Sequence, residues 1–326
     1  MAYENNVNNF MWYPWLNNQY KKIINFYNKN RYSTIIVYNS INDNSNNLLC
    51  YAVSRRLICQ NSNCYKSCNV CNNCILMSNN NYPYYYKLHH LTLNIQKIRD
   101  IITNISKLSL KQVKVIYITN IEKLTYQIIS TLLKIIEYPP SMTYFILSCN
   151  NISIVPMTIR SRCICWSIQI PNENYSIKWL QTIIHNKEII IRTSLRICNG
   201  SPINAILLLQ SKLWNSRYVL LNQLNNALLK NNMLLLLPIL NTNDNKIIYL
   251  LITFISDIIK LMKNTNRSFL MNLDSINKIN SFLSTDNINI YKIYKLWDNL
   301  IKCWYYLNYK NNINRELLIL HFLVNW

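Results

Sequence analysis

The sequence predicts an α/β domain built on a parallel sheet, followed by an all-α carboxy-terminal half. In the first half, short apolar runs rich in β-branched residues alternate with segments of helical periodicity, which is typical of strand–helix–strand units. After Pro171 the strand pattern stops, and helical periodicity continues to the end of the chain. A length of 326 residues exceeds what one core usually requires, so we expect two or three domains.

The first half contains the predicted strands, with helices between them. Each strand is a short apolar run, and the runs are 34–38, 113–119, 143–149 and 163–170. The predicted helices are 48–59, 95–106 and 124–137. The last helix is expected to stop before Pro139 and Pro140.

The second half is predicted to be helical throughout. Short helices are expected first, at 175–185, 189–198 and 202–213. Gly200, the only glycine of the chain, is expected at the C′ position of the middle helix, where a left-handed residue is needed. Farther on, 247–262 is apolar on nearly every face and predicts a buried helix in an all-α domain.

The chain is strongly basic, with 34 Lys and Arg against 13 Asp and Glu and a formal net charge of +21. An excess of Asn, Lys, Ser and Tyr runs through every part of the sequence and indicates an A+T-rich genome, which explains part of that charge. A basic surface also suits a phosphate-bearing partner such as nucleic acid. No long block of consecutive basic residues marks a dedicated DNA-binding tail.

The cellular location is predicted from what the sequence lacks. The amino terminus has no basic segment followed by an apolar one, so no secretion signal is predicted. The most apolar stretches, 228–240 and 247–262, are interrupted by polar residues and are too short to cross a bilayer. We therefore expect a soluble cytoplasmic protein whose cysteines stay reduced.

Five of the eleven cysteines lie between positions 59 and 74. Cys59, Cys68, Cys71 and Cys74 have the spacing C-x8-C-x2-C-x2-C, which fits a closed tetrahedral shell of thiolates around a structural zinc ion. Cys64 could replace Cys59 as the fourth ligand or take no part. The spacing thus predicts a zinc module with one uncertain member.

Other interpretations of the cysteines stay open. An iron–sulfur cluster uses C-x2-C-x2-C, but the usual fourth cysteine followed by proline is missing. Redox chemistry requires a reactive pair, and nothing in the sequence selects one. Cys68, Cys71 and Cys74 could form one stripe of a helix, although Asn72 and Asn73 favour a loop.

The first predicted strand and helix are joined by 39–47, where a nucleotide-binding fold would carry its phosphate loop. This segment has no glycine for close approach to phosphates and no lysine to reach them. The strand 113–119 ends in Thr119 and Asn120, where an active ATPase places a magnesium ligand and a catalytic carboxylate. The sequence therefore predicts no productive ATP binding or hydrolysis by this chain.

One basic motif, Ser161-Arg162-Cys163, precedes the last predicted strand. An arginine at such a place can reach a phosphate held by another subunit and act as an arginine finger. Arg160 and Arg162 could equally be ordinary solvated residues at the end of a strand. Residue pattern alone leaves both interpretations open.

Several stretches recur together in one known family. They are WYPWL at 12–16, LIC at 57–59, Tyr82-Pro83 with Tyr85 and Tyr86, LLK at 132–134 with Glu137 and Pro139-Pro140, TIRSRC at 158–163, GSP at 200–202 and INRELL at 313–318. In their order along the chain, these stretches resemble the delta prime subunits of bacterial DNA polymerase III clamp loaders, which are AAA+ proteins. The segment 214–312 is similar only in its helical character.

The resemblance implies a fold of three domains. An AAA+-like domain with a degenerate phosphate loop and the cysteine module at 59–74 would span 1–167. A three-helix lid would span 168–212, and a helical collar that joins a ring would span 213–326.

The resemblance also implies a function. Delta prime is a stator without ATPase activity in a five-subunit ring with ATPase subunits of the tau or gamma type and a delta subunit. That ring places the sliding clamp on primed DNA, as part of a DNA-directed DNA polymerase in the cytoplasm, at the nucleoid. By position, Arg162 would be the finger offered to a neighbour, with Ser161 and Cys163 in its motif. The four cysteines would hold zinc, with Cys64 a bystander.

The chain departs from the family at a few positions. Tyr138 follows Glu137 where relatives often have a second glutamate, Tyr82-Pro83-Tyr84 replaces a common His-Pro-Asp, and the phosphate loop has lost glycines that relatives retain. These departures concern the geometry of loops and not the implied role. Two alternative functions are kept beside that role. They are an active AAA+ ATPase and a stand-alone, zinc-dependent nucleic-acid-binding protein.

Overall fold

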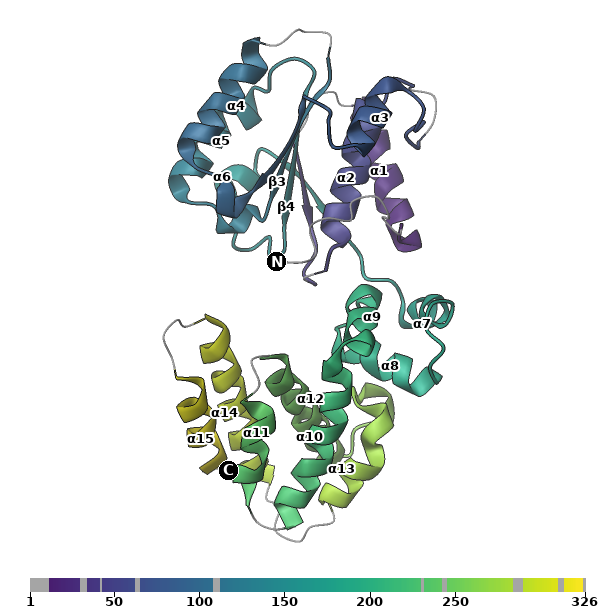
Figure 1. The fold of residues 1–326 in the computed structure, drawn as a ribbon, viewed down its shortest axis with the longest axis vertical. Coiled ribbons are helices and arrows are strands. Elements are labelled where there is room, and N and C mark those ends of the chain that lie inside the picture. The colour runs from purple at the N-terminus through teal and green to yellow at the C-terminus, as the bar shows by residue number, and fades with distance from the viewer. Residues whose placement is uncertain are drawn as a thin grey trace. The chain divides into compact units, whose positions relative to one another are not determined.

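The structure is a computed structural model, and it describes residues 12–29, 34–41, 43–61, 65–107, 112–229, 232–241, 245–283, 290–309 and 314–324. The chain forms two compact units, Met1–Ile170 and Pro171–Trp326 (Figure 1). The predicted division into domains 1–167, 168–212 and 213–326 stays a prediction.

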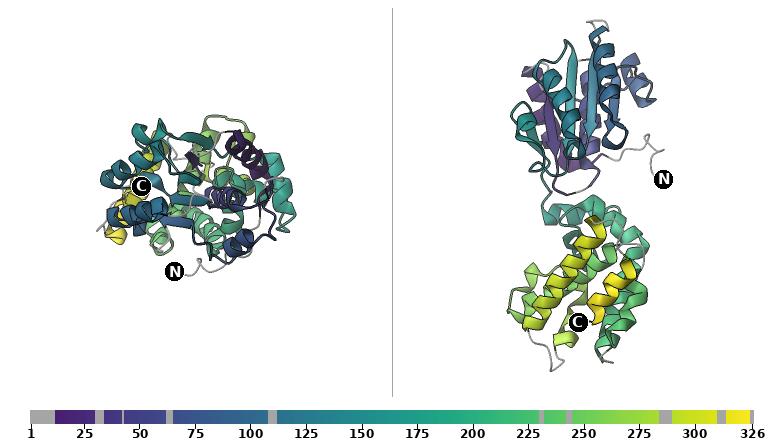
Figure 2. Two further views of the ribbon diagram at one scale, coloured as in Figure 1. Left: turned by 90° about the horizontal axis from the view of Figure 1, so that it is seen from above. Right: turned by 90° about the vertical axis from the view of Figure 1, so that its left-hand side faces the viewer.

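The first unit is built on a five-stranded parallel sheet with the order β2-β3-β4-β1-β5 (Figure 2, right). The strands are β1 Ile35–Tyr38, β2 Tyr85–His89, β3 Lys114–Thr119, β4 Thr143–Cys149 and β5 Ile164–Ser167. Strand β1 lies between β4 and β5, with Ile35 opposite both Ile146 and Ile164. The predicted α/β class with a parallel sheet is confirmed.

Helices cover both faces of this sheet, as a parallel sheet requires (Figure 1). On one face lie α1 Asn17–Lys29, α2 Ser45–Ile58 and α3 Asn72–Ser78, and on the other lie α4 Ile95–Lys107, α5 Tyr126–Glu137 and α6 Met157–Arg160. Successive residues of β1 serve the two cores alternately. Ile35 and Val37 pack with α1 and α2, whereas Ile36 packs with α4 and α5.

Strand β2 and helices α1, α3 and α6 of this unit were not predicted from the sequence. Strand β2 reads Tyr-Tyr-Lys-Leu-His and lies at the edge of the sheet, where only Leu88 of the strand is buried. It therefore lacks the apolar run that identified the other strands. Helix α1 does carry a helical signal, because Tyr20, Ile23, Ile24 and Tyr27 are all buried at the spacing of one helix face.

The second unit begins with α7 Glu173–Gln181, α8 Glu188–Ile197 and α9 Pro202–Gln210. These correspond to the predicted short helices, and their small core contains Ile177, Leu180 and Leu195. The predicted helix 202–213 extends too far. In the structure α9 ends at Gln210, and α10 Lys212–Leu229 begins after Ser211.

Gly200 does not occupy the C′ position that the sequence predicted. Asn199, with φ 52°, follows the C-cap residue Cys198, and Gly200 comes next with φ 82°. The N–H of Gly200 donates to the carbonyl of Leu195 at 2.8 Å, and the N–H of Asn199 donates to Arg196 at 3.1 Å. This is a Schellman motif with Asn199 at C′ and Gly200 at C″.

The rest of the second unit consists of helices and the turns between them in its described part. It contains α10, α11 Leu237–Leu240, α12 Lys246–Met262, α13 Ile276–Leu283, α14 Ile290–Tyr309 and α15 Arg315–Val324, with short 3-10 turns between some of them. Helix α12 is buried along most of its length, which confirms the prediction for 247–262. Within the described ranges, none of the helices combines the length and apolar character that a membrane crossing demands.

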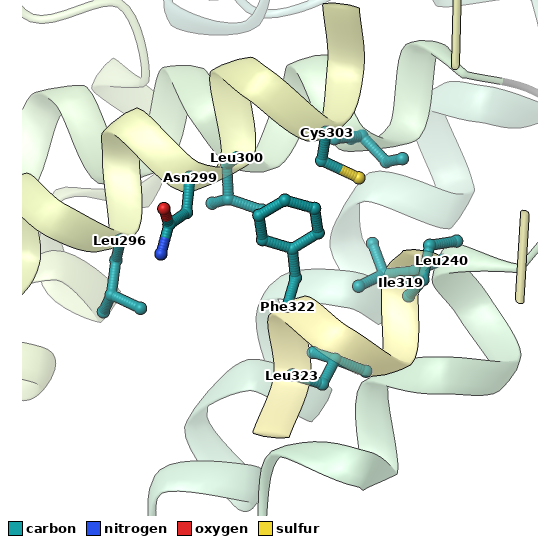
Figure 3. Close-up of a pocket in the computed structure, with 9 residues that line it drawn as sticks. Leu240, Leu296, Asn299, Leu300, Cys303, Ile319, Phe322 and Leu323 are labelled. Carbon is teal, nitrogen blue, oxygen red and sulfur yellow. The ribbon is translucent and has the colours of Figure 1, made fainter. Parts of the chain in front are cut away.

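A small hollow lies between α14 and α15, where the Phe322 ring points toward Leu300 (Figure 3). Its cavity volume is about 10 Å³. A single water molecule already requires about that much space. The hollow is therefore a packing gap rather than a ligand site.

A buried ion pair fixes the loop before α13 to α10. Arg217 is 1% exposed, and its guanidinium donates to both carboxylate oxygens of Asp274 at 2.7 Å and to Asn272 at 2.8 Å. The guanidinium also lies 4.8 Å from the centre of the Trp214 ring. Removing one member of such a pair leaves the other buried without compensation.

Replacing Arg217 with Met should lower the free energy of unfolding by about 3–5 kcal/mol, because the Asp274 carboxylate would lose its partner. The matched control is Arg192→Met, which removes an exposed pair with Glu188 at 2.7 Å and should have a far smaller effect. Urea denaturation at neutral pH measures both variants. Equal effects of the two substitutions would contradict the assignment.

The same pair predicts a pH dependence. Burial raises the pKa of Asp274, but hydrogen bonds and the charge of Arg217 outweigh burial and leave this pKa below its ordinary value of 3.8. The pair thus stabilises the folded chain above that value and loses its effect as the pH falls through the lowered folded pKa. The difference between wild type and Arg217→Met should shrink on acidification.

Candidate functional site

The four cysteines of the predicted zinc module meet at one place. Their sulfur atoms all lie within 4.8 Å of one another. Cys59 follows the last turn of α2, Cys71 immediately precedes α3, and Cys74 belongs to the first turn of α3. The Sγ of Cys68 lies 3.5 Å from that of Cys59 and 3.9 Å from that of Cys74.

Two backbone N–H groups before α3 face sulfur atoms of the cluster. Asn69 has φ 60°, a left-handed conformation that asparagine tolerates. The N–H of Cys68 points to the sulfur of Cys59 at 3.4 Å, and that of Cys71 points to the sulfur of Cys68 at 3.3 Å. Hydrogen bonds from the backbone of Cys71 and Val70 lower the pKa of Cys68 to about 6, which favours the thiolate that binds metals.

These residues fit a metal ion with soft ligands. A tetrahedral zinc ion with bonds of about 2.3 Å separates its sulfur ligands by about 3.8 Å. The Cys59–Cys68 and Cys68–Cys74 separations, 3.5 and 3.9 Å, are close to that value, and all four sulfur atoms lie within 4.8 Å of one another. The four cysteines can therefore hold a metal ion, and their role as its ligands stays a prediction.

The cysteine prediction also concerned Asn72, Asn73 and Cys64. Asn72 and Asn73 were expected in a loop, but both lie in the first turn of α3, because Cys71 is the residue before that helix. The sequence interpretation was wrong there, and Cys68 and Cys71 still lie outside the helix. Cys64 lies outside the described residues.

Side chains in the segment after β1 form hydrogen bonds with one another and with the start of α2. Asn39 is 3% exposed, and its amide donates to Asp43 at 2.9 Å and to the Ser45 hydroxyl at 2.8 Å. The Asp43 carboxylate accepts the backbone N–H of Ser45, the first residue of α2, at 3.0 Å. A carboxylate of the chain thus lies at the positive end of the α2 dipole, where this class of fold binds phosphate.

The end of β3 carries no carboxylate. Thr119 is buried and donates to the carbonyl of Leu88 at 3.4 Å, and Asn120 is left-handed with φ 52°. The next acidic residue, Glu122, lies in the turn after β3, and its carboxylate accepts the N–H of Asn150 at 3.2 Å. Sequence reasoning did not consider Glu122, which the structure ties to the end of β4.

Arg162 lies between α6 and β5 with its side chain 36% exposed. Its guanidinium pairs with Glu137 at 3.2 Å and donates to the carbonyl of Thr158 at 2.9 Å. The motif neighbours differ, since Ser161 is exposed whereas Cys163 is buried and its pKa is raised by burial to about 12. Arg162 is thus held at the surface by two contacts that leave part of the guanidinium open.

The position of Arg162 follows from the direction of the sheet. Strands β1 and β5 run parallel, and Ile35 lies opposite Ile164 while Tyr38 lies opposite Ser167. Arg162 precedes β5, whereas Asn39 follows β1. The two residues therefore lie at opposite edges of the sheet, roughly 13 Å or more apart along the strands.

A parallel sheet of this strand order, a loop and helix α2 after β1, and a helical second unit define an AAA+-type protein. Three family models match successive parts of the chain. They are described as "DNA polymerase III, delta subunit" at 15–172, "DNA polymerase III subunit delta', AAA+ ATPase lid domain" at 171–210, and "DNA polymerase III, delta subunit, C terminal" at 211–326.

Relatives extend the match over the whole chain. The DNA polymerase III subunit delta' of Buchnera aphidicola from Schizaphis graminum is 32% identical over 97% of both chains. That of Yersinia pestis is 29% identical over 97% of this chain and 95% of its own, and that of Escherichia coli K12 is 31% identical over 64% of each. The chain belongs to the DNA polymerase III subunit delta' family, which confirms the resemblance found in the sequence.

The segment after β1 yields a stability prediction. Asn39→Ala should lower the free energy of unfolding by about 1–3 kcal/mol, because it removes the hydrogen bonds from a buried amide to Asp43 and Ser45. Asn44→Ala is the control, since Asn44 is exposed and makes no side-chain cap to α2. Thermal and urea denaturation of both variants measure the difference. A neutral Asn39→Ala would show that the amide does not fasten this segment.

Proposed function

We propose that this chain is the non-catalytic stator of a DNA polymerase III clamp loader, which helps place the sliding clamp on primed DNA. Its full-length relatives are named as delta' subunits of that polymerase. Relatives named as gamma subunits, 27% and 28% identical over 41% and 57% of this chain, support ATPase neighbours of that type. The proposed ring has five subunits and includes a delta subunit.

In this proposal, the chain binds no ATP productively. Its phosphate loop lacks glycine and lysine, and the Asp43 carboxylate lies where a nucleotide phosphate would have to bind. The Asp43 carboxylate and a phosphate would repel each other at the N-terminus of α2. At β3, Thr119 and Asn120 offer no carboxylate for magnesium or for an attacking water. These features favour a stator over the alternative of an active ATPase.

The proposed contribution to catalysis is Arg162 acting in trans. The observation that carries it is the placement of Arg162 at the sheet edge opposite the phosphate loop of its own chain. From there its partly exposed guanidinium cannot serve a nucleotide in cis but can approach one held by a neighbour. An arginine so placed stabilises the charge that develops on a transferring phosphoryl group.

The proposed cofactor is a structural zinc ion held by Cys59, Cys68, Cys71 and Cys74. Zinc suits a closed shell of four thiolates and leaves no open position for catalysis. Such an ion, when bound, would fasten the end of α2 to the start of α3, because Cys59 directly follows α2, while Cys71 precedes α3 and Cys74 lies in its first turn. This arrangement favours a structural role.

In a reconstituted clamp-loader ring, Arg162→Ala should reduce DNA-stimulated ATP turnover, because one ATP site would lose its finger. Removal of such a finger costs roughly 10³–10⁵ at the affected site. Turnover of the whole ring should fall by at least the share of that site. The purified chain alone should show no turnover.

Two controls accompany this measurement. Arg160→Ala removes the neighbouring cation and should leave turnover unchanged, and gel filtration checks that each ring assembles. Unchanged turnover in an intact Arg162→Ala ring would reject the finger. Turnover by the isolated chain would favour the ATPase alternative.

The zinc proposal predicts about one zinc ion per chain, lost in Cys68→Ser, which removes one of four ligands. Loss of the ion should lower the melting temperature, because metal binding contributes to folding free energy. Cys165→Ser is the control, since Cys165 is exposed and outside the cluster. Elemental analysis and thermal melting measure both effects. Iron in place of zinc, or equal metal content in both variants, would contradict the proposal.

A further inference from the structure

A groove of about 400 Å³ lies in the first unit. It is bordered by α1, α2 and part of the cysteine segment, which is the stretch between α2 and α3. Its volume falls in the range of small-ligand sites. Residues from three separate segments line it: the start of the chain with α1, the middle of α2, and residues 65–69 of the cysteine segment. Neither the zinc cluster nor Arg162 belongs to its lining.

Aromatic side chains form the walls of this groove. Trp12 and Tyr20 meet edge to face with ring centres 5.6 Å apart, and the Tyr20 hydroxyl donates to the carbonyl of Tyr65 at 2.6 Å. The Tyr65 side chain is 47% exposed, and Tyr51 lines the groove from α2. The hydrogen bond from Tyr20 thus fixes the segment that carries Tyr65 against α1.

The same groove is positively charged. Lys21, Arg55 and Lys66 line it, and none of the described residues in its lining is acidic. Arg55 lies 5.9 Å from the Tyr51 ring centre and donates to Asn69 at 2.8 Å, while its Nε has no acceptor among the described residues. The lysines at the mouth are exposed and make no ion pair within the described part of the chain.

Flat apolar rings beside unpaired cations match one kind of ligand chemistry. Unpaired nucleic-acid bases stack on aromatic side chains, and the phosphates between them are attracted to lysine and arginine. A duplex offers no free base faces, and its width does not fit a hollow of this size. The geometry therefore favours a single strand.

We propose that this groove binds single-stranded DNA directly, with one or two bases against Tyr65 and its aromatic neighbours and the adjoining phosphates on Lys21 and Lys66. This contact goes beyond the stator role, because it does not depend on the ATP sites of a ring or on Arg162. It would give the chain a nucleic-acid site of its own.

The test is binding of a fluorescent oligothymidylate of about 20 nucleotides to the full zinc-containing chain, followed by anisotropy at several salt concentrations. The Lys21→Gln, Lys66→Gln double variant should weaken binding about tenfold and reduce the salt dependence. The matched control, Lys97→Gln with Lys123→Gln, removes two exposed lysines of the same unit outside the groove and should change affinity less than about twofold.

A second pair of variants tests stacking. Tyr65→Leu should weaken binding about tenfold, whereas Tyr65→Phe should keep it, because only the ring is required. Both keep the backbone carbonyl that accepts from Tyr20. Equal losses in the groove and control lysine pairs, or a duplex bound as tightly as the single strand, would overturn the proposal. Groove-dependent binding of a tyrosine-containing acidic peptide, without oligonucleotide binding, would instead identify a peptide site.

Discussion

The common direction of the five strands is the constraint on which the first unit depends. Because the strands are parallel, everything that follows a strand gathers at one edge, and everything that precedes a strand gathers at the other. The segment after β1 and the turn after β3 thus share one edge, while Arg162 lies at the opposite edge. Glu137, at the end of α5, also leads toward the amino end of β4 and can pair with Arg162 there. Strand direction alone therefore places Arg162 and the segment after β1 at opposite ends of the strands.

At the carboxyl ends of the strands, a side chain of the chain itself accepts the first N–H of α2. In a nucleotide-binding fold the backbone N–H groups at this helix N-terminus bind phosphate. Here Asp43 accepts from Ser45, and the buried amide of Asn39 holds both side chains. A second link, from the Asn46 amide to the carbonyl of Cys149 at 3.0 Å, fixes the first turn of α2 to the end of β4. These hydrogen bonds therefore hold the segment after β1, the start of α2 and the end of β4 together.

The sequence predicted those features that depend on local pattern. Buried strands appear as apolar runs, so four of the five were found, while edge strand β2 has one buried residue and was missed. Cysteine spacing predicted that the sulfurs of the cluster would meet. Features that depend on distant partners could not be predicted. The pairing of Arg162 with Glu137 and the meeting of Trp12, Tyr51 and Tyr65 around one groove require the fold itself.

A chain with one glycine raises the question of whether the glycine-free phosphate loop carries any meaning. Of the six described non-glycine residues with positive φ, five are asparagines, at positions 69, 80, 120, 199 and 264. Asparagine tolerates the left-handed region, so an asparagine-rich chain can build its turns without glycine. It cannot, however, replace glycine where a missing Cβ lets a phosphate approach the backbone. The absence of glycine is therefore uninformative in the turns, but in the segment after β1 it supports the proposal that this chain does not bind nucleotide, in agreement with the Asp43 carboxylate at the N-terminus of α2.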